Sequence, residues 1–291
     1  MANKKRTLSA QDEVHLRAVL QTATLAALMD SRRWEPGDIA FQGGTSLHLA
    51  HGSARFSEDL DFMVRGSLSL EGLSREVKKK LRLPFDIASD LAVSVTAIKD
   101  HRNPHSFYVS LAGPLVIGSV KVKIELWKTS ASAMHALTLK VSTISSAAGQ
   151  TFVPTLTLGE IFADKVYALG ARERVKPRDL FDLWWLYEKD APQLTMQCLG
   201  NRLNIYPAPS GKSLDTAHAW LQNALARMAE LKAPGAANRV AQDLKRWLPA
   251  SWPMDNSAAA TPMLQRSIAQ LQHGIDMMRT FIAAQADTEQ P

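Results

Sequence analysis

Three observations predict an α+β protein in two lobes. Short segments with alternating apolar and polar residues, the pattern of half-buried strands, occur between residues 39 and 126 among helical segments. After Thr155 the apolar spacing becomes helical almost to the end of the chain. The 291 residues are enough for one large or two ordinary domains. We therefore expect a mixed-sheet α+β domain over residues 1–155 and a mostly helical domain over residues 156–291.

The first-half elements follow from local signals. Ser9 and Asp12 make a capping-box pattern ahead of apolar residues at helical spacing, which predicts a helix ending near Arg32. The turn at Pro36-Gly37 leads into a strand over 39–41. We also expect helices over 44–50 and 68–83, and strands over 60–64, 91–98, 107–111 and 119–126, the last two as a hairpin.

The second half contains only helical signals. Thr157 and Glu160 form another capping-box pattern, which predicts a helix that runs to about Gly170. Pro177 suits the first turn of the next helix, which should end near Lys189. Further helices are expected over 215–232, 236–247 and 261–284.

Composition limits the class of protein. The chain has 34 basic and 28 acidic residues, a net charge of +6, and this tilt mildly favours a polyanionic partner such as RNA. Cys198 is the only cysteine, which excludes an intramolecular disulfide and a thiolate metal cluster. The basic start leads into a polar segment, and no apolar run approaches the ~20 residues of a membrane span. A cytoplasmic protein without membrane contact is expected.

The residues most suggestive of chemistry are two glycines and two aspartates. Gly43 and Gly44 separate a short strand from a helix, where backbone amides can bind a phosphate. Asp59 and Asp61 alternate along the next apolar strand, so both carboxylates face one way with Cα atoms roughly 6.6 Å apart. Paired carboxylates suit hard cations such as Mg²⁺. Phosphate on one side and divalent metal on the other indicate nucleotide chemistry.

This combination resembles the polymerase-β-like nucleotidyltransferase superfamily, whose signature is Gly-Gly/Ser, a short helix and Asp-x-Asp. The runs Phe41-Gln-Gly-Gly-Thr-Ser-Leu47 and Arg55-Phe-Ser-Glu-Asp-Leu-Asp-Phe62 are most similar to the AbiEii/AbiGii-type toxins of bacterial toxin–antitoxin and abortive-infection systems. The resemblance implies a nucleotidyltransferase lobe and a helical lobe that closes the active-site cleft. A turn followed by solvated acids is the alternative for the motif alone.

The superfamily normally has a third carboxylate on a later strand, and Glu125 is the candidate. In the segment Gly118–Trp127, apolar residues form one face, while Lys121, Lys123 and Glu125 form the other. The resemblance implies that Glu125 completes a metal site with Asp59 and Asp61, although aspartate is commoner at this position. A half-exposed strand with its charges in water is the alternative.

Two later residues match the toxin family. The family shows a helix of the form Ala-x-Lys-x-x-Ala-Leu and then Arg-Asp-Leu-x-Asp-Leu, which places Lys165 and Asp179 at the site. The lysine would act on a triphosphate oxygen, and Asp179 would bind that lysine or position a hydroxyl. Asp182 is expected to be structural or an ion-pair partner. Arg55 would bind phosphate or clamp its loop, and Ser57 would contact the nucleotide or cap the turn.

The resemblance implies transfer of a nucleoside monophosphate from an NTP to an acceptor hydroxyl, with release of pyrophosphate. Two Mg²⁺ ions would be held by Asp59, Asp61 and Glu125. The phosphates would lie against the segment from Gly43 through Gly44 and Thr45 to Ser46, and Lys165 would neutralise charge on the pyrophosphate.

Two partners are implied as well. They are RNA, notably the tRNA 3′ end, and a separately encoded antitoxin. Basic residues at 78–82 and 172–176 are candidates for RNA contact, with solvated surface charge as the alternative. Two other functions stay open, an antibiotic-modifying nucleotidyltransferase and a non-catalytic nucleotide-binding module.

Overall fold

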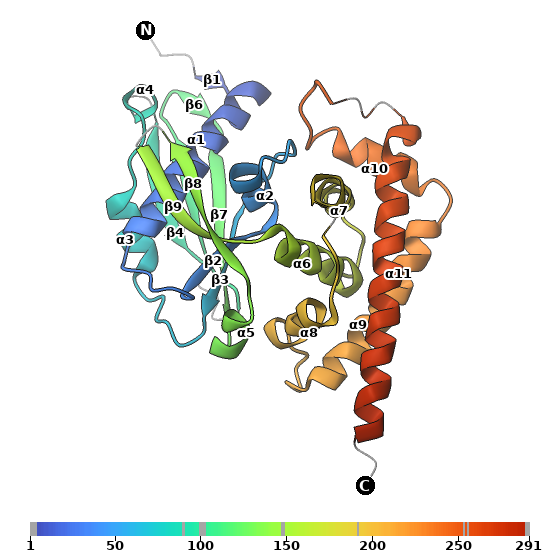
Figure 1. The fold of residues 1–291 in the computed structure, drawn as a ribbon. Helices are drawn as coiled ribbons and strands as arrows, with labels where there is room; N and C mark the ends of the chain where they lie inside the picture. The colour runs from blue at the N-terminus through green and yellow to red at the C-terminus, as the bar shows by residue number, and fades with distance from the viewer. Residues whose placement is uncertain are drawn as a thin grey trace. The chain divides into compact units, whose positions relative to one another are not determined.

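The computed structural model describes residues 5–88, 91–98, 103–146, 149–190, 192–252, 254 and 256–288. The chain divides into two compact units. The first comprises Met1–Gly52, Ser57–Met134 and Leu139–Thr155, and the second comprises Ser53–Phe56, His135–Thr138 and Leu156–Pro291. The first unit holds a mixed sheet and the second holds the C-terminal helices, which confirms the predicted α+β class (Figure 1).

The first unit is built on a seven-stranded sheet of order β4-β5-β7-β3-β2-β9-β8. The central pair β3–β7 is parallel, as is β2–β9, while β2–β3, β4–β5 and β5–β7 are antiparallel. A separate two-stranded ladder pairs β1 with β6. The strands are β1 (Arg6–Thr7), β2 (Ile39–Gln42), β3 (Leu60–Arg65), β4 (Ala92–Ala97), β5 (His105–Ala112), β6 (Val116–Ile117), β7 (Val120–Thr129), β8 (Leu139–Ser146) and β9 (Gly149–Leu156).

One face of the sheet is apolar because β7 alternates strictly. Val122, Ile124 and Leu126 are buried and join a hydrophobic core with Leu20 and Leu28 of α1. Helix α1 packs against β5, β7 and β8, and α3 packs against α1 and β4 (Figure 1). The alternate positions Lys121, Lys123 and Glu125 project from the opposite face. The helices of this unit are α1 (Ala10–Asp30), α2 (Gly43–His51), α3 (Leu73–Lys80), α4 (Phe85–Ala88) and most of α5 (Ala131–His135).

Several expected elements of this unit are confirmed and one is corrected. Ser9 caps α1 in a complete capping box with Asp12, and β5 pairs with β7 as the predicted hairpin. The helix expected over 68–83 is shorter, because Gly72 takes a left-handed conformation (φ 73°) just before α3 begins. The strands β8 and β9 were not predicted. In β8 the buried positions are Ser142 and Ile144 while Val141 is exposed, so apolar residues do not mark the buried face of this strand.

The second unit is helical. Trp220 of α9 is buried against Gly170 of α6 and donates its indole N–H to the carbonyl of Tyr167 at 2.8 Å. Helix α11 runs along α7, α9 and α10 (Figure 1). Within the described ranges no helix has the length and apolarity needed to cross a membrane. The helices are α6 (Leu158–Ala171), α7 (Pro177–Asp190), α8 (Met196–Ile205), α9 (Ser213–Lys232), α10 (Ala236–Leu244) and α11 (Ser257–Thr288).

The capping box predicted at the start of α6 is wrong. Thr157 is the N-cap residue, but its side chain makes no capping hydrogen bond. Glu160 accepts hydrogen bonds from the backbone N–H of Thr138 at 3.1 Å and from Arg202 Nη1 at 2.6 Å. Since Arg202 is fully buried, its charge requires this carboxylate, and the tertiary ion pair takes precedence over the local cap.

Gly170→Ala should destabilise the second unit by about 1–3 kcal/mol through overpacking. A Cβ at Gly170 would lie 2.5 Å from Trp220 Cε2 inside a close-packed core. Denaturant unfolding followed by tryptophan fluorescence measures the effect. Gly159→Ala is the matched control, because it lies in the same helix with nothing within 4 Å of an added Cβ and should be neutral or stabilising. Equal stability of both variants would contradict the packing argument.

Candidate functional site

The first candidate group begins with a close contact between Gly43 and Asp61. Gly43 follows β2 directly and has φ 79°, a conformation that side-chain-bearing residues rarely adopt. A Cβ at this position would collide with the Asp61 carboxylate, at 3.1 Å from its Cγ. Backbone and carboxylate therefore meet where only glycine fits.

Asp61 lies opposite a second carboxylate. In the parallel pair β3–β7, Asp61 is in register with Glu125, and the neighbouring apolar residues of both strands are buried. Adjacent strands are ≈ 4.8 Å apart, and register partners point to the same face. The structure thus brings together the predicted pair Asp61 and Glu125 at the centre of the sheet.

Lys123 lies among these carboxylates. It is on the same face of β7 as Glu125 and forms an ion pair with Glu125 Oε1, and both side chains are about one-third exposed. This hydrogen bond is the main reason that the pKa of Lys123 is raised, and the charge of Asp59 raises it further. Asp59 therefore acts on the same small region as the other two acids.

Thr45 and Ser46 are buried in the first turn of α2. The Thr45 hydroxyl donates to the backbone carbonyl of Asp59, so it positions the start of the aspartate strand. The N-cap residue Gln42 makes no side-chain capping bond. The groups at the start of α2 that can bind an anion are therefore its first backbone amides, including those of Gly43 and Gly44.

The donor set fits a hard divalent cation. Asp59, Asp61 and Glu125 supply only carboxylate oxygens, the ligands that Mg²⁺ prefers, and two of them are register partners. In the part of the chain that the structure describes, however, no three acidic, histidine or cysteine side chains converge as a metal cage. Glu125 is bound to Lys123 instead.

The second candidate group lies in the helical unit and contains Arg55. Only 2% of Arg55 is exposed, and it donates from Nε and Nη2 to the two oxygens of Asp182 at 2.7 and 2.8 Å. Its Nη1 donates to the carbonyl of Phe56 at 2.8 Å. Of the two roles predicted for Arg55, this geometry favours the clamp, because bidentate pairing uses its guanidinium fork. Asp182 is an ion-pair partner, as predicted.

Lys165 and Asp179 join the same buried network. Lys165 Nζ lies 2.9 Å from Asp179 Oδ1 and 2.7 Å from Asp182 Oδ2, and Arg172 pairs with the other Asp179 oxygen. Burial is the main cause of the lowered pKa of Lys165, and the charges of Arg55 and Arg172 lower it further. Burial acts to raise the pKa of Asp182, but Arg55 and Lys165 outweigh it and bring the value down to about 2.

The predicted residues therefore form one group in each unit. Asp59, Asp61 and Glu125 belong to the sheet unit with Gly43, Gly44, Thr45, Ser46 and Ser57, and Arg55, Lys165 and Asp179 belong to the helical unit. Sequence reasoning missed Lys123 as a partner of Glu125, although their shared strand face was visible in the alternation. It also missed that Arg172 pairs with Asp179, for which the sequence holds no signal.

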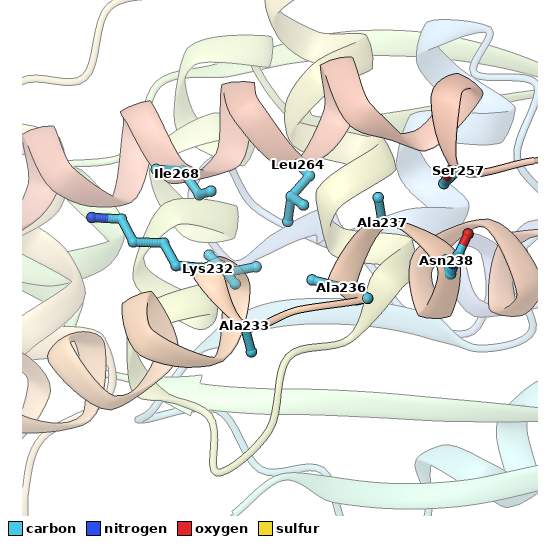
Figure 2. Close-up of a pocket in the computed structure, with 10 residues that line it drawn as sticks. Lys232, Ala233, Ala236, Ala237, Asn238, Ser257, Leu264 and Ile268 are labelled. Carbon is cyan, nitrogen blue, oxygen red and sulfur yellow. The ribbon is translucent and has the colours of Figure 1, made fainter.

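An open pocket in the helical unit lies elsewhere. It has a volume of about 480 Å³ and is formed by the end of α9, α10 and the first turns of α11, with Lys232, Asn238 and Leu264 in its lining (Figure 2). None of the candidate site residues lines it. Its lining is mainly alanine and leucine-type side chains, and it carries no cluster of reactive groups.

Comparisons with known proteins identify the family of the chain and similar folds. Residues 27–238 match the family model described as the nucleotidyl transferase AbiEii toxin of a type IV TA system. The fold is similar to that of MenT4, a nucleotidyltransferase toxin from Mycobacterium tuberculosis, with a TM-score of 0.56 and 15% identity over 93% of this chain and 89% of that one. JHP933 from Helicobacter pylori has a TM-score of 0.50 and 19% identity over 96% and 99% of the two chains. A search of curated proteins found no match.

The buried network makes stability depend on acid pH. The pKa of Asp182 is about 2 in the folded protein, below the ordinary 3.8, so its ionisation stabilises the fold above about pH 4. This contribution, about 2 kcal/mol for such a shift, is lost as pH falls through 2. Asp182→Asn should remove it, so the stability advantage of the wild type over the variant should shrink between pH 5 and pH 2.

Urea unfolding at a series of pH values measures that difference. Asp276→Asn is the control, because Asp276 is exposed and its ion pair with Arg279 is 3.7 Å long, so its effect should stay below about 1 kcal/mol. A wild-type advantage that is constant from pH 5 to pH 2 would show that Asp182 is not held ionised by its neighbours.

Proposed function

We propose that this chain transfers a nucleoside monophosphate from an NTP to the tRNA 3′ end, with release of pyrophosphate. The chain belongs to the AbiEii family of nucleotidyltransferase toxins of type IV toxin–antitoxin systems. The observation that carries the chemistry is the register of Asp61 with Glu125, together with the contact of Gly43 with Asp61. It supports a site in which the Asp61 carboxylate lies beside a backbone suited to phosphate.

The triphosphate would lie at the start of α2. The first-turn amides of Gly43 and Gly44 have no intrahelical acceptor, and the helix dipole favours an anion there. Because Thr45 and Ser46 are buried, these backbone amides, and not the hydroxyls, would carry the binding. The contact between Gly43 and Asp61 would hold the phosphates next to the carboxylates without a side chain between them.

Asp59, Asp61 and Glu125 would hold the divalent cations, which we take to be two Mg²⁺ ions. When bound there, such ions would lower the pKa of the acceptor hydroxyl and neutralise charge on the leaving pyrophosphate. The chain's own part is to orient the acids. The Thr45 hydroxyl fixes the backbone at Asp59, and strand pairing fixes Asp61 against Glu125.

Lys165 is assigned to the pyrophosphate and Asp179 to the positioning of that lysine. Their 2.9 Å ion pair and the lowered pKa of Lys165 support this role, since strongly perturbed lysines cluster at functional sites. Asp182, which pairs with both Arg55 and Lys165, would hold the lysine in position. Ser57 stays a candidate contact of the nucleotide.

RNA is the acceptor class that the charge of the chain supports. The net charge is +6, and Arg174 and Lys176 are basic residues that adjoin the Lys165 group in sequence. Basic side chains bind a phosphate backbone with a strong dependence on salt. We place the reaction in the cytoplasm, where tRNA and NTPs occur together, and expect a separately encoded antitoxin to restrain it.

The test is transfer of label from α-³²P-NTPs to total bacterial RNA with Mg²⁺ present. We expect a labelled band of tRNA size that EDTA abolishes. Asp61→Asn should lower labelling by at least about 100-fold, because even residues that only support a metal ligand cost 10–100-fold. The Asp61→Asn variant should keep the wild-type melting temperature to within a few degrees.

Each other outcome has a clear meaning. Labelling of an aminoglycoside but not of RNA would identify an antibiotic-modifying enzyme. Labelling in EDTA, or undiminished labelling by Asp61→Asn, would refute the metal site. NTP binding without transfer to any acceptor would indicate a nucleotide-binding module.

Gly43→Ala should reduce transfer by about 100-fold, because a shift of the Asp61 carboxylate by about 1 Å is enough for such a loss. Gly52→Ala is the matched control. Gly52 ends the same helix with φ 81°, so alanine meets the same backbone strain there, but nothing lies within 4 Å of its Cβ. Gly52→Ala should lose about 1 kcal/mol of stability from backbone strain, and Gly43→Ala should lose at least as much because the collision with Asp61 is added. Only Gly43→Ala should lose activity. Equal activity losses would assign the effect to strain in α2 and not to the contact with Asp61.

A further inference from the structure

Lys123 lies beside the carboxylates that are proposed to bind metal. Asp61 is in register with Glu125, and Asp59, just before β3, acts electrostatically on Lys123. Positions 123 and 125 share one face of β7, so the lysine and the three acids occupy a single patch of the sheet.

The ammonium group of Lys123 interacts with two of these acids. It is bound to Glu125 Oε1, and Asp59 attracts it electrostatically. The ion pair with Glu125 places a positive group on this carboxylate patch. In the described ranges no three such side chains form a ready metal cage, and Glu125 is paired with Lys123 there.

We propose that Lys123 is an internal counter-ion that holds Glu125 in the metal-free protein and gives it up when a divalent cation binds, so that Lys123 sets the cation concentration at which the site fills. This inference rests on the proposed function, which assigns the carboxylates to Mg²⁺. The competition is direct, because one oxygen of Glu125 cannot serve the ammonium and the metal equally well.

Two properties of Lys123 suit exchange better than a permanent structural bond. Its side chain is 29% exposed, so the ammonium can turn into water when Glu125 is taken by the metal. A pair this exposed contributes little to stability, so its loss is not costly to the fold. Removing the lysine should therefore act mainly on cation affinity.

The experiment is isothermal titration of Mn²⁺ alone into the whole protein, with Lys123→Met compared with the wild type. We expect Lys123→Met to bind Mn²⁺ about tenfold more tightly, because it removes a positive charge a few ångströms from the incoming cation and frees Glu125. In thermal melts, Mn²⁺ should raise the melting temperature of Lys123→Met more than that of the wild type.

Lys121→Met is the matched control. Lys121 lies on the same face of the same strand and is exposed, but no ion pair joins it to the acids in the described structure. It loses the same charge and should change Mn²⁺ affinity by less than about twofold. In a Glu125→Gln background, Lys123→Met should have a much smaller effect, because the contested carboxylate is gone.

The outcomes separate this inference from the function on which it rests. If the wild type binds Mn²⁺ and Asp61→Asn abolishes binding, but Lys123→Met leaves the affinity unchanged or weaker, the counter-ion role is refuted while the metal site stands. Equal tightening by Lys121→Met also refutes it, since the effect would then be general surface charge. If the wild type shows no Mn²⁺ binding that depends on Asp61, the metal site fails, and the inference fails with it.

Discussion

The parallel pairing of β3 with β7 is the constraint on which the candidate site depends. Its register places Asp61 opposite Glu125 and buries Phe62, Ile124 and Leu126 on the other side of the sheet. A shift of either strand by one residue would turn that strand's carboxylate into the apolar core and expose its own core residues to water. The hydrophobic core of α1 and the sheet therefore holds the acids in register at the same time as it stabilises the fold.

The turn before α2 adds a second constraint to the same acids. Gly43 approaches the Asp61 carboxylate so closely that no side chain fits between them, and Thr45 binds the backbone at Asp59. Both residues come directly after β2, which is the antiparallel neighbour of β3. Two adjacent strands thus position the backbone at Gly43 and the acids relative to one another, and the proposed chemistry requires such positioning.

Charge is handled differently in the two groups. In the sheet unit, Lys123 and Glu125 are each about one-third exposed, so water can replace either partner and the pair can exchange. In the helical unit, Arg55, Lys165 and Asp182 are buried, and each needs its partners because an unpaired charge there would be costly. The first arrangement suits the binding of a cation from solution, and the second suits a lysine that must stay in one position.

The sequence by itself determined the α+β class, most helices, the central strands and the Gly-Gly and Asp-x-Asp residues, because periodicity, caps and turn glycines are local signals. The position of Glu125 was also predictable, since strand alternation puts it on the polar face. Tertiary structure decided the rest. Glu160 pairs with the buried Arg202 and does not form the expected cap. Arg55 forms an ion pair with Asp182, and Lys123 forms one with Glu125. Each depends on which distant charge the fold brings within reach, and the free energy of pairing a buried or crowded charge exceeds that of a local motif.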